Sequence, residues 1–165
     1  MLSKISGAGL VLLAVCVAMP AFAQQGGQVQ SKLTATQVVD VDGRTVAWSA
    51  AQAHPGDVVE YQATYSNSGA TGVGHLLATI PVPTGTTYVA SSAKPATGVQ
   101  ASVDGVHFAP MPLMHTVKDA DGKSVQKPVP LSDYRALQWQ IATLAAHADV
   151  TTSLQVRINA PVTTK

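Results

Sequence analysis

Two histidines and two methionines gather in one short stretch and are the residues of this chain best suited to bind a metal. They are His107, Met111, Met114 and His115. Thioether sulfur and imidazole nitrogen are soft to intermediate ligands that suit copper. The stretch is therefore a candidate copper site. The favoured interpretation is that the methionines cover the edge of the hydrophobic core and the histidines lie in solvent, and copper binding is the alternative.

One serine motif has the spacing of a known catalytic group. Ser91-Ser92-Ala93-Lys94 fits the S-x-x-K pattern of penicillin-recognising enzymes, which place the serine at the start of a helix. Here the motif follows a predicted strand and precedes Pro95. The companion motifs S-D-N and K-T-G are absent from the chain, and so is the G-x-S-x-G elbow of hydrolases. We therefore predict no enzymatic activity, no catalytic residues and no cofactor.

The N-terminal segment predicts export. Lys4 precedes an apolar run over residues 8–19, and Ala21-Phe22-Ala23 fits an A-x-A cleavage site. The run is shorter than the roughly 20 apolar residues that span a bilayer. A retained anchor is one alternative, and a lipoprotein signal at Cys16 is another, although Val15 before it is not a small residue. We predict a signal peptide over 1–23 and a mature protein in the periplasm, on the outer surface or outside the cell.

The composition of the mature chain limits its partners. Removing residues 1–23 from 165 leaves 142, enough for one domain with its own core. Cys16 is the only cysteine, so no disulfide can stabilise the mature fold. Removing Lys4 from ten basic residues leaves nine, which balance nine acidic ones. A neutral chain without a basic patch does not favour nucleic acid, and no second apolar run predicts a transmembrane segment.

Short β-strands separated by turn residues account for most of the mature sequence. The clearest is 57–67, where Val59, Tyr61, Ala63 and Tyr65 alternate with polar residues and predict one buried face. The other predicted strands cover 33–39, 44–48, 75–80, 87–91, 99–103, 106–108, 136–141 and 152–159. Leu137, Trp139 and Ile141 are predicted to share an inward face, as are Leu154, Val156 and Ile158.

The pattern predicts an all-β fold, a single antiparallel β-sandwich of about 7–9 strands. Asp40–Gly43 and Asp104-Gly105 are predicted hairpin turns. Residues 109–131, with four prolines, are predicted to form a long loop. The domain boundaries are a flexible leader over 24–31, the sandwich over 32–160 and a C-terminal tail over 161–165.

A series of motifs follows in order between Val46 and Asn159. They are Pro55-Gly56-Asp57, Tyr61, Asn67-Ser68-Gly69, Pro81-Val82-Pro83, Gly85-Thr86-Thr87-Tyr88-Val89, Ser102-Val103-Asp104-Gly105 and Trp139-Gln140-Ile141-Ala142-Thr143-Leu144. This order resembles the conserved repeat domain of bacterial and archaeal cell-surface proteins, a domain of unknown function. The family usually has an Asp where this chain has Ile80, and often has Pro-Gly where it has Ala146-His147.

The resemblance implies an immunoglobulin-like β-sandwich that is structural or adhesive and carries no catalytic residues. Open sandwiches have edge strands that can pair with another chain. We therefore predict a non-enzymatic exported module of the envelope or cell surface, which acts in adhesion or assembly by protein–protein contact or self-association. A fibre subunit would be one form of it. The alternative is a periplasmic copper carrier that uses residues 107–115.

Overall fold

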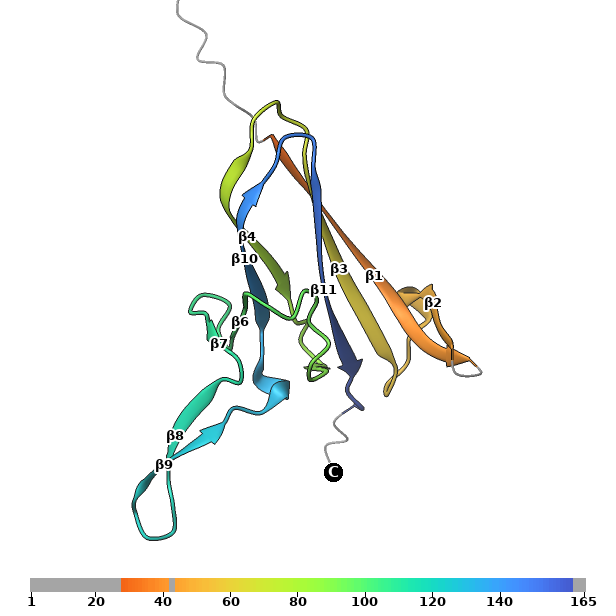
Figure 1. Cartoon of the computed structure of the whole chain (residues 1–165). Helices are drawn as coiled ribbons and strands as arrows, with labels where there is room; N and C mark the ends of the chain where they lie inside the picture. Colours follow the sequence, from red (N-terminus) through yellow and green to blue (C-terminus); the bar gives the residue numbers. More distant parts are fainter. Residues whose placement is uncertain (1–27, 42–43, 162–165) are drawn as a thin grey trace, which may run out of the picture.

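The computed structural model describes residues 28–41 and 44–161 and is built from β-strands (Figure 1). The described residues form two short 3-10 turns, η1 (Ala50–Gln52) and η2 (Leu131–Asp133), and eleven strands. The strands are β1 (Val29–Val41), β2 (Arg44–Ser49), β3 (Val58–Asn67), β4 (Val73–Pro81), β5 (Thr86–Tyr88), β6 (Val99–Ser102), β7 (Ala109–Pro110), β8 (Met114–Lys118), β9 (Ser124–Pro128), β10 (Ala136–Leu144) and β11 (Asp149–Ile158). The all-β prediction is confirmed. The predicted signal peptide, residues 24–27 of the leader, the turn at 42–43 and residues 162–165 lie outside the described residues.

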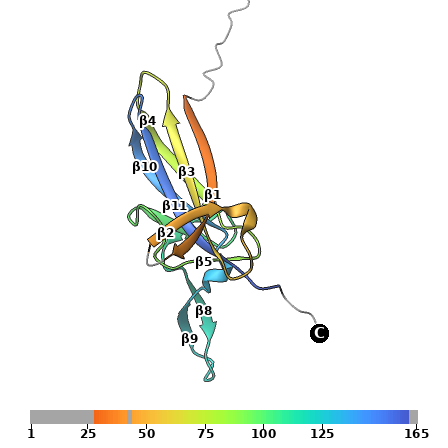
Figure 2. The same cartoon turned by 90° about the vertical axis from the view of Figure 1, so that its right-hand side faces the viewer.

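The strands form two facing sheets and a separate ribbon. The first sheet has the order β2-β1-β3-β11-β5, and the second has the order β4-β10-β6-β7. The ribbon consists of β8 and β9 alone and projects away from the two sheets (Figures 1 and 2). Every strand pair is antiparallel.

The connectivity differs from that of an immunoglobulin constant domain at two positions. Such a domain places its strands in the order A-B-E-D in one sheet and C-F-G in the other. Lettering β1, β3, β4, β5, β6, β10 and β11 as A to G gives A-B-G-D and C-F-E. The fifth and seventh strands are therefore exchanged, although the antiparallel layers have the same strand positions.

The core lies between the middle strands of the two sheets. Side chains alternate along each strand, so one face of β3, β10 and β11 is buried. Trp139 on β10 is 1% exposed and donates its indole N–H to the Pro95 carbonyl at 2.8 Å. The predicted inward faces are confirmed at the positions that are fully buried, which are Val59, Ala63, Leu137, Trp139, Leu154 and Val156. Tyr61, Tyr65, Ile141 and Ile158 are partly buried against the same cluster.

One buried amide joins the two turns at the end of the sandwich where β3 leads into β4. The Asn67 side-chain Nδ2 donates to the carbonyls of Thr71, Leu144 and Ala145 at 2.9, 3.2 and 3.0 Å. Its Oδ1 accepts the Gly69 N–H at 3.0 Å. Because Leu144 and Ala145 lead from β10 into β11, this side chain ties both crossings between the sheets together.

The prediction of a long loop over 109–131 is wrong, because most of this segment forms the β8–β9 ribbon. Val117 pairs with Val125, and Asp119 Oδ1 accepts the N–H groups of Asp121 and Lys123 in the turn between the strands. The four prolines that suggested a loop lie at the base of the ribbon. They are Pro110, Pro112, Pro128 and Pro130. The two strands of the ribbon bring the strand count to eleven, above the predicted seven to nine.

Two further boundaries differ from the prediction. β1 begins at Val29, so the last residues of the predicted leader belong to a strand. The hairpin centred on Asp104-Gly105 is wider than predicted, because β6 pairs with β7 through Gln100↔Pro110 and Ala101↔Ala109. Asp104 Oδ1 accepts the N–H groups of residues 106 and 107, which bends the chain there instead of extending it as a strand.

Candidate functional site

Part of the inner face of the first sheet has no second layer over it among the described residues. β4 is the outermost strand of the second sheet and contacts β3, and no described strand of that sheet lies beyond it over β1. Leu33 on β1 is paired with Ala63 on β3, so both point to the same face. Ala63 is 4% exposed, whereas Leu33 is 51% exposed. The inner face is therefore covered at Ala63 on β3 and open at Leu33 on β1.

A second exposed apolar area lies on β2 and is separated from Leu33 by Gln37, which is 8% exposed. Trp48 on β2 is paired with Gln37 on β1, and Gln37 is paired with Val59 of the core, so Trp48 points to the same inner face. Val46 lies two residues away on that face and is also exposed, while Trp48 is 52% exposed. We call Leu33, Val46 and Trp48 the uncovered face. A group of exposed large apolar side chains on one surface is typical of interaction sites.

The outer side of β4 presents backbone groups that pair with no strand in the described part of the chain. Gln140 donates its N–H to Gly98, toward the β6 side of β10. Residues that face each other in an antiparallel pair either bond to each other or both point away. Gln140 faces Leu77, and Gln138 faces Thr79. Leu77 and Thr79 therefore point their N–H and C=O groups away from β10, toward the free edge.

This edge lacks two of the usual protections against pairing, charged residues and internal prolines, although His75 within it has a left-handed φ of 54°. Proteins commonly keep edge strands short or place charged residues and prolines on them. The other outer strands, β5, β7 and β2, are three, two and six residues long, whereas β4 has nine. The sequence of β4, VGHLLATIP, has no Asp, Glu, Lys or Arg and has a proline only at its end. β4 is thus suited to accept another strand.

Tyr65 links the core to this edge. Its hydroxyl donates to the Thr79 carbonyl on β4 at 3.5 Å, which is the long limit of a hydrogen bond. Partial burial raises the pKa of Tyr65, and the hydrogen bond to Thr79 opposes the rise. The phenol therefore stays protonated at neutral pH. It makes a weak hydrogen bond to the Thr79 carbonyl, one of the acceptors at the free edge.

The predicted copper ligands are spread over different environments. His107 is exposed, and its Nδ1 lies 2.6 Å from Asp104 Oδ2. Met111 is partly buried against the core. Met114 and His115 are neighbours on β8 and therefore point to opposite faces of the ribbon. Among the described residues no group of three or more His, Cys, Asp or Glu side chains is placed to hold a metal ion. The copper site stays a prediction.

The Ser91–Lys94 segment is a turn fastened to β11. The Ser92 hydroxyl donates to the Val89 carbonyl at 2.7 Å and accepts the Gln155 N–H at 2.9 Å. The backbone of Lys94 pairs with Ser153 in both directions at 2.8 Å. These bonds give the motif a structural role in holding the chain after β5 against the first sheet.

Sequence reasoning anticipated open edges in general but not which strand would be one. The sequence signal for this strand is the lack of Asp, Glu, Lys and Arg over residues 73–81. In the described ranges, no helix has the length and apolar character needed to cross a bilayer. Searches of protein-family models, curated proteins and solved structures found no match to this chain.

Proposed function

We propose that this chain is an exported, non-enzymatic interaction module that binds another polypeptide by β-strand addition to β4. The observation that carries the proposal is the position of the uncharged β4 edge beside the uncovered face of β1 and β2. In strand addition, main-chain hydrogen bonds supply affinity and alternate side chains fill pockets on one face.

The geometry allows both kinds of contact at once. A strand beside β4 would take the N–H and C=O groups of Leu77 and Thr79. Facing sheets lie about 10 Å apart, so the same strand would lie opposite β1 and place alternate side chains over Leu33. The bound segment is therefore extended, with apolar residues at every second position on its inward face.

The occupant that this proposal names is a second copy of the chain. The edge is uncharged and the mature chain carries no net charge by formal count, so two copies meet without long-range repulsion. The predicted signal peptide supports a place outside the cytoplasm. The resemblance to the cell-surface repeat domain supports an adhesive or structural role on an immunoglobulin-like sandwich, with two strands exchanged.

The test is self-association of the mature chain, Gln24–Lys165, measured by sedimentation velocity with hydrogen exchange. We expect association that rises with concentration and slows amide exchange at Leu77 and Thr79. Thr79→Pro removes an N–H that faces the free edge without breaking the β10 ladder, and Leu33→Asp places a charge on the uncovered face. Both variants should stay monomeric.

Thr34→Asp is the matched control, because it places the same charge next to Leu33 but on the opposite face of β1. It should associate like the wild type. A mature chain that remains monomeric at millimolar concentration, or that associates without protection of Leu77 and Thr79, would overturn the proposal.

Export has its own test. The intact mass of the protein recovered outside the cytoplasm should correspond to Gln24–Lys165, with a loss of one ammonia if the N-terminal glutamine cyclises. A chain that begins at Cys16 and carries a diacylglycerol-sized addition would instead identify a lipoprotein.

A further inference from the structure

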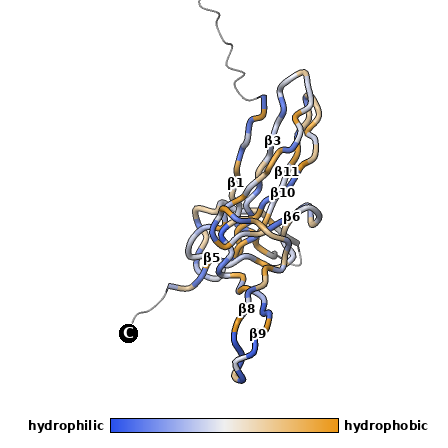
Figure 3. Tube along the Cα trace, turned by 90° about the vertical axis from the view of Figure 1, so that its left-hand side faces the viewer, coloured by the Kyte–Doolittle hydropathy of each residue, from blue (hydrophilic) through white to orange (hydrophobic). Residues whose placement is uncertain are grey.

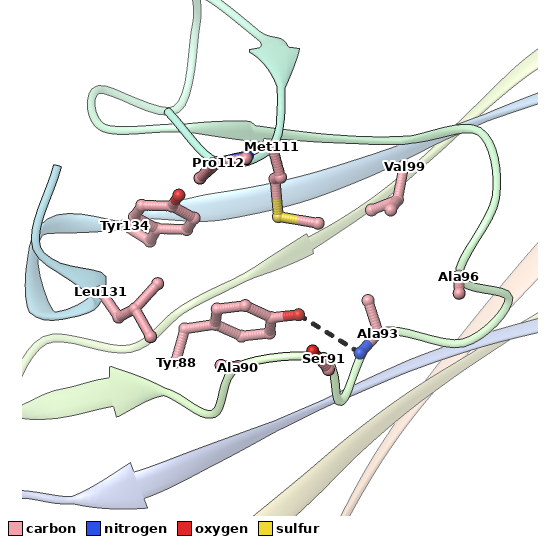
Figure 4. A pocket seen from close by; sticks show the side chains of 10 residues that line it. All are labelled: Tyr88, Ala90, Ser91, Ala93, Ala96, Val99, Met111, Pro112, Leu131 and Tyr134. Carbon is pink, nitrogen blue, oxygen red and sulfur yellow. Dashed lines mark hydrogen bonds between the residues drawn. The ribbon is translucent and has the colours of Figure 1, made fainter. Parts of the chain in front are cut away.

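A cavity of about 360 Å³ lies beside the core, between β5 and the segments that lead into and out of the ribbon (Figure 4). Its walls are aromatic, aliphatic and thioether side chains, and the only polar side-chain groups on them are hydroxyls. The ten lining residues are Tyr88, Ala90, Ser91, Ala93, Ala96, Val99, Met111, Pro112, Leu131 and Tyr134.

Two stacked tyrosines form one wall. The rings of Tyr88 and Tyr134 lie 5.8 Å apart between centroids and are within 6° of parallel. Both residues are buried, at 3% and 1% exposed. The Met111 side chain extends toward the cavity beside these rings, with Leu131 near Tyr88 (Figure 4). Thioether sulfur makes favourable contacts with aromatic rings, so this wall suits an aromatic guest.

Both tyrosine hydroxyls accept a hydrogen bond and have an O–H group available to donate another. The Tyr88 hydroxyl accepts the Ala93 N–H at 3.3 Å, and the Tyr134 hydroxyl accepts the Leu113 N–H at 3.0 Å. Within the described part of the chain, neither hydroxyl donates to an acceptor. A buried hydroxyl normally uses its donor as well, because an unpaired polar group costs free energy. A bound molecule with an acceptor atom would receive a hydrogen bond from one of these hydroxyls.

The lining also determines the charge of the guest. None of the ten lining residues is Asp, Glu, Lys, Arg or His. An ion entering this apolar wall would lose its hydration without gaining a partner. The cavity therefore favours neutral molecules over ions of the same shape.

We propose that this cavity binds a small, neutral aromatic molecule that accepts a hydrogen bond from a tyrosine hydroxyl. The size fits, because an apolar cavity of about 150 Å³ already holds benzene, and ligand pockets range from about 300 to 1,000 Å³. This site is separate from the β4 edge, since none of its lining residues belongs to β1, β2 or β4.

The two methionines of the mature chain allow a direct test by methyl NMR. Met111 lines the cavity, whereas Met114 lies on the ribbon and is exposed. The probes are acetophenone, which has a ring and an acceptor, ethylbenzene, which lacks the acceptor, and benzoate, which is charged. Acetophenone should shift the Met111 methyl signal through its ring current and leave the Met114 signal in place. Met111→Leu and Met114→Leu assign the two signals.

Acetophenone should bind about three- to tenfold more tightly than ethylbenzene, the ratio for one neutral hydrogen bond, and benzoate should bind least. Tyr88→Phe should reduce the preference for acetophenone. Ala90→Trp should block binding from an exposed position on the rim, and the matched control Ala120→Trp on the exposed ribbon turn should bind like the wild type. The proposal is overturned if Met111 does not shift at millimolar acetophenone, if Met114 shifts equally, or if Ala90→Trp binds unchanged.

Discussion

The inner face of the first sheet has a covered part and an open part that share one pattern of alternation. Over β3 and β11 the second sheet buries Ala63 and Leu154, but over β1 and β2 it leaves Leu33 and Trp48 half exposed. Figure 3 shows hydrophobic residues along the strands of the sandwich, while the tip of the β8–β9 ribbon is hydrophilic. An inward-facing apolar residue is therefore no guarantee of burial, because burial also requires a facing strand.

The largest difference should appear between the only two tryptophans of the chain. Trp139→Ala removes a fully buried ring and its hydrogen bond to Pro95, and should cost about 3–5 kcal/mol of unfolding free energy. Trp48→Ala lies on the uncovered face and should cost less than about 0.5 kcal/mol, as at ordinary surface sites. Chemical denaturation of both variants measures the contrast. Equal losses would show that the two regions are covered alike.

The next effect concerns the turns that join the covered parts of the two sheets. Asn67→Ala leaves the carbonyls of residues 71, 144 and 145 without their donor and should cost about 2–3 kcal/mol. The matched control is Asn159→Ala, since Asn159 is the other asparagine of the chain and is exposed. Thermal unfolding of the two variants compares them. A loss at Asn159 as large as that at Asn67 would contradict the role given to the buried amide.

A smaller effect is expected from shortening the side chain on the uncovered face. Leu33→Ala should change the unfolding free energy of the monomer by less than about 0.5 kcal/mol, because the Leu33 side chain is half exposed. Leu154→Ala, on the same face of the same sheet, should cost about 2–5 kcal/mol. Denaturation at low protein concentration keeps self-association out of the measurement. A cost at Leu33 comparable with that at Leu154 would mean that another element covers β1 in solution.

The smallest effect should come from Asp104, which lies outside both regions in an exposed turn. Hydrogen bonds from the His107 side chain, from the N–H groups of His107 and Val106 and from Ser102 hold the pKa of Asp104 well below its usual range. The unfolded chain has the ordinary value of about 3.9. Ionised Asp104 therefore stabilises the fold fully above that value, and its contribution falls as the pH drops through the lower folded-state pKa.

Carboxyl NMR should show that Asp104 stays ionised at a pH where ordinary aspartates are protonated. The melting temperature of Asp104→Ala should lie slightly below that of the wild type at pH 7, and the gap should narrow as the pH falls below about 4. Solvent screens this exposed group, so the gap should be small. A gap that widens on acidification would have the wrong sign.

The strands of the sandwich and their buried faces could be predicted because alternation is a local property of the chain. Tyr61, Leu137, Trp139 and Leu154 alternate with polar residues, and each lies on the expected face. The two incorrect predictions also concern local structure. The turn at Asp119 makes a strand pair of the proline-containing segment, and the hydrogen bonds to Asp104 widen the hairpin at residues 104 and 105. The His and Met residues at 107–115 lie close in sequence, but their side chains lie apart. The bend after Asp104 leaves His107 in solvent, Met111 packs against the core, and Met114 and His115 point to opposite faces of β8.

Tertiary packing alone determined which edge is open and where the cavity lies. β4 is an outer strand because it pairs only with β10, whose other side pairs with β6. β10 is far from β4 in sequence. Leu33 is exposed because the second sheet ends one strand before β1. Tyr88 and Tyr134 stack although 46 positions separate them. Each of these contacts joins distant parts of the chain, and a local period of two carries no information about which strand will lie opposite.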